Sequence, residues 1–334
     1  MPNHFKIYKG FVANLEKIGF SIELVFTSDQ DFRYENFSQK VYNFLKKTFL
    51  GDKDFKAKLQ SSYDDRSLAK ALLKIETKVD YALVIRPDYF SKETLCLLKN
   101  KTNQLVAYQW DGLDRYPKVK NLIEIFDRFF LFDADDFVKY KSIYPNVFQS
   151  HNFYFDFEFL TKVNNIEKSQ KEVFFVGSFI ENRIKDIIYI AKIFDDLDFQ
   201  LNINLLYFEE STPEKYEHCG INFIDQPLSY LEVLEEVKNA DVILDFADTV
   251  HNGLSFRIFE TLRFSKKLIT NNPLVRKYDF YSPNNILIWE QSLDQTEIKE
   301  FLTEDYKKLD ETILQKYSFT NWIDHIINQQ AEER

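Results

Sequence analysis

Cysteine is almost absent from this sequence. Only Cys96 and Cys219 occur among its 334 residues, which is too few for a framework of disulfide bonds. Neither has a second metal-binding side chain at a suitable spacing, and the histidines show no zinc-binding pattern either. We therefore expect two inert thiols and no bound metal.

Long apolar runs are missing as well. No segment approaches the roughly 20 residues that a membrane-spanning helix needs. No signal peptide is apparent, because Met1 to His4 lead directly into an amphipathic run. We expect a cytoplasmic protein with, at most, peripheral contact at the inner face of the membrane.

Positive charge is in deficit, with 43 lysines and arginines against 53 acidic residues and a net charge of −10. This balance argues against a general nucleic-acid-binding protein. Glycine is scarce too, with seven residues. No Walker loop, dinucleotide-binding Gly-x-Gly-x-x-Gly motif or nucleophile elbow occurs. The sequence therefore predicts no tightly held cofactor.

What is present is an alternation of apolar strands and amphipathic helices over a length that suits about two domains. Strands are predicted at 21–26, 81–85, 105–108, 128–132, 173–176, 199–208, 221–223, 242–245 and 268–270. Such alternation is typical of parallel, doubly wound α/β sheets. The polar segment 161–171 divides the pattern in two and is typical of a linker.

The first half begins with a predicted helix, from Phe5 to Ile18, where a doubly wound domain normally begins with a strand. The first strand is therefore shortened or missing, and we expect the sheet to start at 21–26. Further helices are predicted at 37–49, 65–77 and 118–126.

The segment from Asn252 to Asn272 carries the most specific signal. Asn252-Gly253 indicates a turn, Ser255 is placed to cap a helix, and Leu268-Ile269-Thr270 is typical of a buried strand. A helix N-terminus after a glycine loop offers free N–H groups to an anion. In the predicted helix Arg257 adds donors suited to phosphate, and Glu260, near the same face, suits ribose hydroxyls. The alternative is an ordinary helix whose arginine and glutamate form a surface pair.

This segment resembles the donor-binding loop and helix of GT-B glycosyltransferases, especially bacterial lipopolysaccharide and capsule enzymes. The resemblance implies that Glu260 binds the ribose of a nucleotide sugar, and that Ser255 and Arg257 bind its diphosphate. Many retaining members have a second glutamate eight positions earlier, where this chain has Asn252. Retaining chemistry is therefore not implied.

The resemblance also implies two Rossmann-like domains facing a cleft. The acceptor domain would cover residues 1–160 and the nucleotide-sugar domain residues 172–315. The aromatic, amphipathic tail at 316–334 resembles the last GT-B helix, which crosses back to the first domain. The alternative is a terminal helix that docks locally.

A second donor-binding candidate is Gly177-Ser178, interpreted as a tight loop between a strand and a helix that contains Arg183. Ligands of doubly wound domains bind at the carboxyl ends of strands, where a glycine lets the backbone approach phosphate. Ser178 and Arg183 would supply hydrogen bonds to it. The alternative is a purely structural turn.

The candidate general base is Asp111, in a Trp110-Asp111-Gly112 segment after a predicted strand. It resembles a Trp-Asp segment that capsule-type relatives place at the interdomain cleft, where a carboxylate would take the proton of the acceptor hydroxyl. The alternative is an Asp-Gly turn beside a packed tryptophan. Asp88 is a weaker candidate, and His251 would polarise a sugar or phosphate oxygen unless it is a plain loop residue.

The strongest alternative to a metal-independent site is the segment Asp133-Ala134-Asp135-Asp136, which also follows an apolar strand. Metal-dependent GT-A glycosyltransferases hold a divalent cation with an Asp-x-Asp at such a place. Acidic residues also cap helix N-termini, and a helix is predicted to start at Asp136.

Three hypotheses follow. The first is a metal-independent GT-B glycosyltransferase that moves a sugar from a nucleotide donor to a cell-surface glycan or its lipid-linked precursor. The second is a catalytically silent, glycosyltransferase-like binding or assembly subunit, suggested by Asn252 and by the absent first strand. The third is a GT-A enzyme that uses Asp133 and Asp135.

Overall fold

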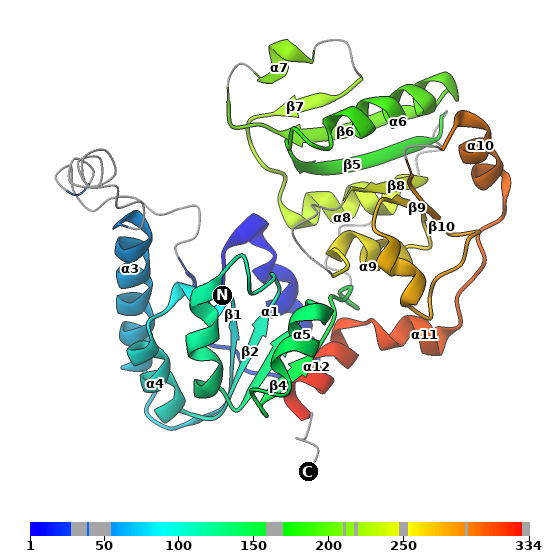
Figure 1. Cartoon of the computed structure of the whole chain (residues 1–334). Coiled ribbons are helices and arrows are strands. Elements are labelled where there is room, and N and C mark those ends of the chain that lie inside the picture. The colour runs from blue at the N-terminus through cyan, green and yellow to red at the C-terminus, as the bar shows by residue number, and fades with distance from the viewer. Residues whose placement is uncertain are drawn as a thin grey trace.

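Two parallel sheets, one in each half of the chain, organise the protein (Figure 1). The structure is a computed structural model that describes residues 1–27, 39, 55–157, 170–209, 212–216, 220–246, 253–290 and 293–328. The predicted helix at 37–49 lies outside these ranges apart from one residue, as does most of the segment 161–171. Every strand pairing in the described ranges is parallel, which confirms the predicted α/β class.

The first sheet has the strand order β1-β2-β3-β4. Its strands are β1 (Val79–Ile85), β2 (Thr102–Gln109), β3 (Arg128–Leu131) and β4 (Val147–Gln149). The helices and 3₁₀ turns of this half are η1 (His4–Lys6), α1 (Tyr8–Lys17), α3 (Phe55–Leu72), η3 (Pro87–Tyr89), α4 (Lys92–Asn100), η4 (Pro117–Ile125) and α5 (Ala134–Tyr140). Strands β2 and β3 are buried almost throughout, as expected of strands covered on both faces.

The second sheet is larger and has the order β10-β9-β8-β5-β6-β7. Its strands are β5 (Glu172–Ser178), β6 (Gln200–Leu206), β7 (Asn222–Ile224), β8 (Val242–Asp245), β9 (Lys267–Thr270) and β10 (Ile286–Ile288). Its helices and 3₁₀ turn are α6 (Ile184–Asp196), α7 (Thr212–Lys215), α8 (Tyr230–Asn239), α9 (Phe256–Arg263), η5 (Pro273–Lys277) and α10 (Gln295–Thr303). β4 and β10, each three residues long, were not anticipated.

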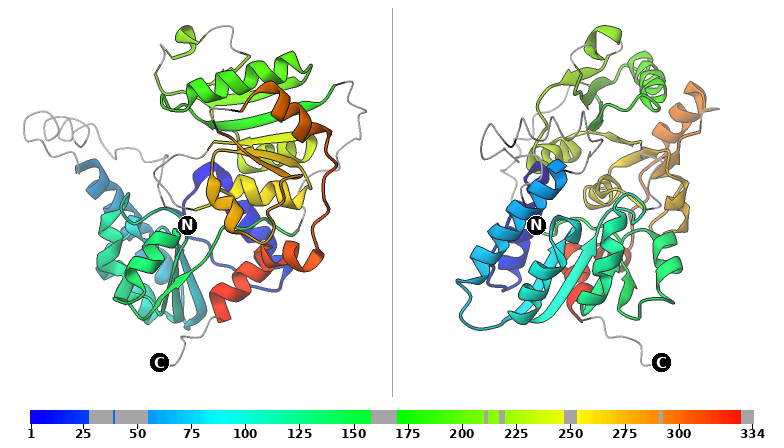
Figure 2. Two further views of the ribbon diagram at one scale, coloured as in Figure 1. Left: turned by 45° about the vertical axis from the view of Figure 1, so that its right-hand side comes forward. Right: turned by 60° about the vertical axis from the view of Figure 1, so that its left-hand side comes forward.

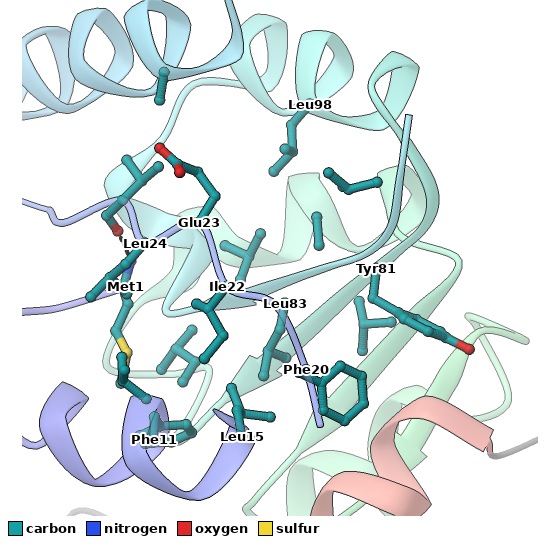
Figure 3. A pocket seen from close by; sticks show the side chains of 18 of the residues that line it. Met1, Phe11, Leu15, Phe20, Ile22, Glu23, Leu24, Tyr81, Leu83 and Leu98 are labelled. Carbon is teal, nitrogen blue, oxygen red and sulfur yellow. Dashed lines mark hydrogen bonds between the residues drawn. The ribbon is translucent and has the colours of Figure 1, made fainter. Parts of the chain in front are cut away.

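The predicted strand at 21–26 is wrong. This segment joins no strand ladder, and β1 forms the edge of the first sheet. The backbone of Met1 takes up its hydrogen bonds instead: Met1 N donates to Val25 O and Thr27 N donates to Met1 O. An apolar cavity of about 250 Å³ lies between the segment and β1, lined by Ile22 and Leu83 among others (Figure 3). Alternation of side chains made the segment resemble a strand, but its pairing partner was decided elsewhere.

Three local predictions also need correction. Gly177 and Ser178 are the last two residues of β5 and not a loop after it. Arg183 is the N-cap of α6 and not a residue inside that helix. The helix predicted at 118–126 is the 3₁₀ segment η4. In each case the apolar pattern located the element, while its boundary or helix type depended on packing.

The C-terminal segment forms α11 (Glu311–Lys316) and α12 (Phe319–Asn328), and α12 lies against the first domain beside β4 (Figures 1 and 2). Trp322 is buried, donates its indole N–H to Ser150 Oγ over 3.1 Å and lies edge-on to Tyr108. His325 packs on Phe130. The end of the chain therefore shares the apolar core of the first domain.

None of the helices in the described ranges is both long enough and apolar enough to span a membrane.

Candidate functional site

The carboxyl ends of three neighbouring strands of the second sheet bring polar side chains together. Ser178 ends β5, Asp245 ends β8 and Thr270 ends β9. The N-cap of helix α9, Ser255, follows ten residues after Asp245 and is hydrogen-bonded to it, so the N-terminus of α9 lies at the same edge of the sheet. This is the edge at which parallel α/β domains bind ligands.

Asp245 organises this edge. Ser255 Oγ donates to Asp245 Oδ1 over 2.7 Å, and Thr270 Oγ1 donates to Asp245 Oδ2 over 2.9 Å. Ser255 does occupy the N-cap position of α9, as predicted, but its side chain makes no capping hydrogen bond. Its hydroxyl instead ties the start of α9 to the end of β8.

Arg257 and Glu260 form an ion pair one turn into α9, with 3.3 Å between Arg257 Nη1 and Glu260 Oε2. The pair is not on the surface, because the side chains are only 15% and 2% exposed. Arg257 also lies over the ring of Phe174 in β5, at 5.4 Å. Burial raises the pKa of Glu260, an effect that the charge of Arg257 opposes. In this conformation the glutamate faces the protein interior.

Arg183 links the ends of β5 and β8 at the same edge of the sheet. Its Nη1 donates to Phe246 O over 2.8 Å, and its Nη2 donates to Ser178 O. A Cβ on Gly177 would lie 2.9 Å from Arg183 Nη2, so the glycine makes room for the guanidinium. Gly177, Ser178 and Arg183 therefore lie together, held by contacts within the protein.

Residues of both domains contact the loop before α9. A Cβ on Gly253 would lie 2.1 Å from Cζ of Phe132, which follows β3 in the first domain. Asn152 donates to Leu254 O, and Asn272 donates to Gly253 O, both over 2.9 Å. The remaining predicted loop residues, His251 and Asn252, lie outside the described residues.

Asp111 lies at the carboxyl end of the first sheet within a cluster of charges. Arg86 Nη1 donates to Asp111 Oδ2 over 2.9 Å, and Arg115 Nη1 is 3.6 Å from Asp111 Oδ1. Arg86 also forms a fork with Asp88, with both N–O distances 2.7 Å, and lies over the ring of Tyr116 at 3.6 Å. The two aspartates proposed as bases therefore share one arginine.

Arg86 itself is unusual in two respects. Its backbone is left-handed, with φ 60°, a conformation that non-glycine residues adopt rarely. Burial alone would lower the pKa of its guanidinium, but hydrogen bonding and charge attraction from Asp88 outweigh burial and raise it. The Arg86 cluster is thus an ionised network in a largely buried place.

The Asp111 segment reaches the second domain through its tryptophan. Trp110 contacts Phe256, the first residue of α9, edge-to-face with 6.3 Å between ring centroids. The structure therefore brings the segment that carries Asp111 to the start of α9, across the domain boundary.

The acidic run 133–136 has structural partners. Asp133 caps α5 by accepting hydrogen bonds from the N–H groups of Asp135 and Asp136. Asp136 accepts from Leu113 N over 2.6 Å, and burial raises its pKa. Among the described residues, no three acidic, histidine or cysteine side chains are grouped so that they could hold a metal ion.

Sequence reasoning missed three residues that organise these clusters: Arg86, Asn152 and Asp245. Arg86 and Asp245 each sit at the end of an apolar strand, and that position was the available signal. Asn152 gave no signal, because its role depends on contacts with Tyr108 in one domain and Leu254 in the other.

Comparison by sequence found no matching family model and no matching curated protein. Comparison of structures found clear similarity. A TarM variant from S. aureus, crystallised with fondaparinux, alpha-GlcNAc-glycerol and UDP, has a TM-score of 0.51 at 12% identity, over 80% of this chain and 59% of that one.

Two further structures match comparably. A proposed UDP-N-acetylglucosamine 2-epimerase from Listeria monocytogenes has a TM-score of 0.51 at 10% identity, over 98% of this chain and 95% of that one. The glycosylation-associated Gap123 complex from Streptococcus agalactiae has a TM-score of 0.50 at 13% identity, over 80% and 58%. This chain thus spans under two thirds of the length of the TarM and Gap123 chains.

At these identities the similarity concerns the fold. It agrees with the two parallel sheets of this chain. A GT-A enzyme would not have this two-domain plan, so that interpretation is wrong: the chain has the GT-B fold.

Proposed function

We propose that this protein is a glycosyltransferase that moves a sugar from a nucleotide-sugar donor to a cell-surface glycan or a lipid-linked precursor, without a metal ion. One observation carries the proposal: in a GT-B fold, Ser255, Arg257 and Glu260 stand on the first turns of a helix at the carboxyl edge of the second sheet. Ser178 and Arg183 stand at the same edge.

The leaving diphosphate would be stabilised by the N-terminus of α9 and by Arg257, with Arg183 as a second cation. Preorganised N–H groups and a guanidinium can replace a metal in this role because they are already oriented when the negative charge develops. Arg183 is held in place by two backbone carbonyls, which gives it such an orientation.

Glu260 would bind the ribose. Because it is buried against Arg257 here, donor binding would separate the pair: the guanidinium would turn to the diphosphate and the carboxylate to the ribose hydroxyls. The exchange replaces one charge-assisted interaction with two, so neither charge is left unpaired.

Asp111 would activate the acceptor hydroxyl. Its contacts with Arg86 and Arg115 hold the side chain in one place, and a general base must be positioned near the oxygen whose proton it takes. Trp110 would hold the segment against α9. If Asp111 is the base, Asp111→Asn should lower kcat by about 100-fold or more, with donor affinity unchanged.

Calorimetry with UDP, GDP, CDP and CMP tests the donor site. At least one nucleotide should bind the wild type. Arg257→Ala should weaken binding by about 1.5–3 kcal/mol, because a charge-assisted hydrogen bond is lost, and Glu260→Ala should weaken binding through the nucleoside part. Arg257→Lys keeps a positive charge and serves as the control for folding. Equal binding by all forms would overturn the site assignment.

A chelator tests metal independence. Transfer by the full chain is expected to continue in excess EDTA. Loss of transfer that manganese or magnesium restores would contradict the proposal.

The second candidate is a catalytically silent, glycosyltransferase-like subunit. The burial of Glu260 favours it, and one of the structures with this fold is a complex of glycosylation-associated proteins. Neither transfer nor hydrolysis of any bound nucleotide sugar by the purified chain is the outcome that this candidate predicts.

A further inference from the structure

A cleft of about 1010 Å³ lies between the two domains on the side of α11 and α12. Gln149, Ser150 and His151 line it from the end of β4, and Leu274, Lys277, Tyr278 and Asp279 line it from η5 and the residues after it. Gln315, Lys316 and Asn321 line it from α11 and α12. We refer to it as the α12 cleft. It exists because the last helix crosses to the first domain.

The α12 cleft is separated from the donor-binding residues by α9. Arg257 and Glu260 face Phe174 and Tyr230 on one side of this helix. Phe259 faces the other side, where His151 stacks on it with ring centroids 5.9 Å apart. A ligand in the α12 cleft would therefore not occupy the place proposed for the nucleotide.

Two features of its position suit a ligand. The residues from Gln149 to His151 follow a strand of the first sheet, and η5 follows β9 of the second sheet. Both groups thus stand at carboxyl edges of parallel strands, where α/β domains bind ligands. The volume lies at the upper end of the range for ligand pockets, which is about 300–1,000 Å³, and so suits more than one sugar ring.

The lining is polar without a dominant charge. Lys277 and Lys316 are balanced by Asp135 and Asp279. Asp279 is already engaged, because Lys316 Nζ lies 2.7 Å from its Oδ2 and Tyr317 donates its hydroxyl to Oδ1. A cleft with cancelled charges does not favour a phosphate or a nucleic acid over a neutral ligand.

The uncharged groups indicate what the ligand is. Gln149, Gln315 and Asn321 are exposed amides, and the ring of Tyr278 is partly exposed beside them. One N–H of Asn321 donates to Gln315 O and one N–H of Gln315 donates to Glu311 Oε1, which leaves the second N–H and the amide oxygen of each to bind a ligand. Hydroxyl groups also donate and accept, and the apolar faces of sugar rings pack on aromatic rings. Amides beside a tyrosine are therefore complementary to a polyhydroxylated chain.

We propose that the α12 cleft binds a short, uncharged oligosaccharide. Its identification with the acceptor side of the reaction rests on the proposed function, but the binding of a saccharide does not. The saccharide is held at the domain boundary by residues of both domains and of the crossing helix.

Saturation-transfer NMR on the full chain tests this with four probes: maltotetraose, isomaltotetraose, chitotetraose and a galactose tetrasaccharide. At least one should receive saturation from the protein. Gln315→Ala should weaken that binding about fivefold, as the loss of one hydrogen bond does. Asn321→Trp should weaken it further, because the variant loses an amide and its bulky side chain narrows the cleft. Lys308→Ala, at an exposed position outside the lining, should change nothing.

Three outcomes would overturn the proposal: no signal from any of the four probes, equal binding by Asn321→Trp and wild type, or tighter binding of a sulfated tetrasaccharide than of its neutral counterpart. Arg257→Lys separates the proposed function from the saccharide site in the α12 cleft, because this variant should weaken UDP binding and leave saccharide binding unchanged. If a saccharide binds but no nucleotide does, the proposed function fails and the cleft assignment stands. If a nucleotide binds but no saccharide does, the cleft assignment fails and the proposed function stands.

Discussion

Two carboxylates, one in each domain, pair with arginine at the domain boundary, yet their surroundings differ. Asp111 is 16% exposed and contacts Arg86 and Arg115, which are distant from each other in sequence. Glu260 is 2% exposed and contacts Arg257 on its own helix. Asp111 thus has two arginine partners and some access to water, whereas Glu260 has one arginine partner, the neighbouring Tyr230 and almost no access to water. Loss of the arginine–carboxylate pair should therefore destabilise the protein less in the first domain than in the second.

Arg257→Ala should cause the largest loss of stability. It leaves Glu260 buried without its countercharge, and removal of one partner of a buried pair costs about 3–5 kcal/mol. Urea unfolding of the variant at pH 7 would measure the loss. Adding Glu260→Gln should recover most of it, since the uncompensated charge is gone; no recovery would mean that the arginine acts through packing on Phe174 instead.

Gly253→Ala tests the contact between the two regions. The added Cβ would meet the ring of Phe132 at 2.1 Å, so one domain must shift, and overpacking of this kind costs about 1–3 kcal/mol. Thermal unfolding would report it. Phe132→Leu in the same chain should relieve part of the cost, and strictly additive effects would contradict the contact.

Asp111→Asn should have a smaller effect on stability, about 1 kcal/mol or less, as for partly exposed ion pairs. Arg86 keeps both hydrogen bonds to Asp88 in this variant, so no buried cation is left alone. The measurement is urea unfolding beside Arg257→Ala. A loss as large as that of Arg257→Ala would remove the distinction between the two carboxylates.

The smallest expected effect is a pH dependence at Glu260. Burial raises its pKa above the ordinary value of 4.5. A raised folded-state pKa contributes stability that is present below about pH 4.5 and lost as pH rises through the raised value. The stability of wild type relative to Glu260→Gln should therefore decrease between pH 4 and pH 8 in urea unfolding. An increase over that range would show that Arg257 dominates over burial.

Much of the fold followed from local patterns. Apolar runs such as 105–108 and 242–245 identified strands because strands covered on both faces must be apolar throughout. The prediction at 21–26 failed because a strand also needs a partner strand, and the backbone groups of Val25 and Thr27 bond to Met1 instead.

The candidate site was only partly predictable. The Arg257–Glu260 pair followed from helical spacing, but its burial did not, because that depends on Phe174 and Tyr230 from other elements. The ion pair of Asp111 with Arg86 likewise joins residues 25 positions apart. Sequence spacing reports neighbours along one element and says little about neighbours across elements.

The sequence by itself determined the α/β class, most strands, the start of α9 and the polar residue types on its first turns. These features depend on side-chain periodicity and on capping, which act over a few residues. Only the tertiary structure decided that Glu260 is buried, that Asp111 shares Arg86 with Asp88, and that a cleft forms beside α12. Those outcomes depend on how distant elements pack, and packing is a property of the whole chain.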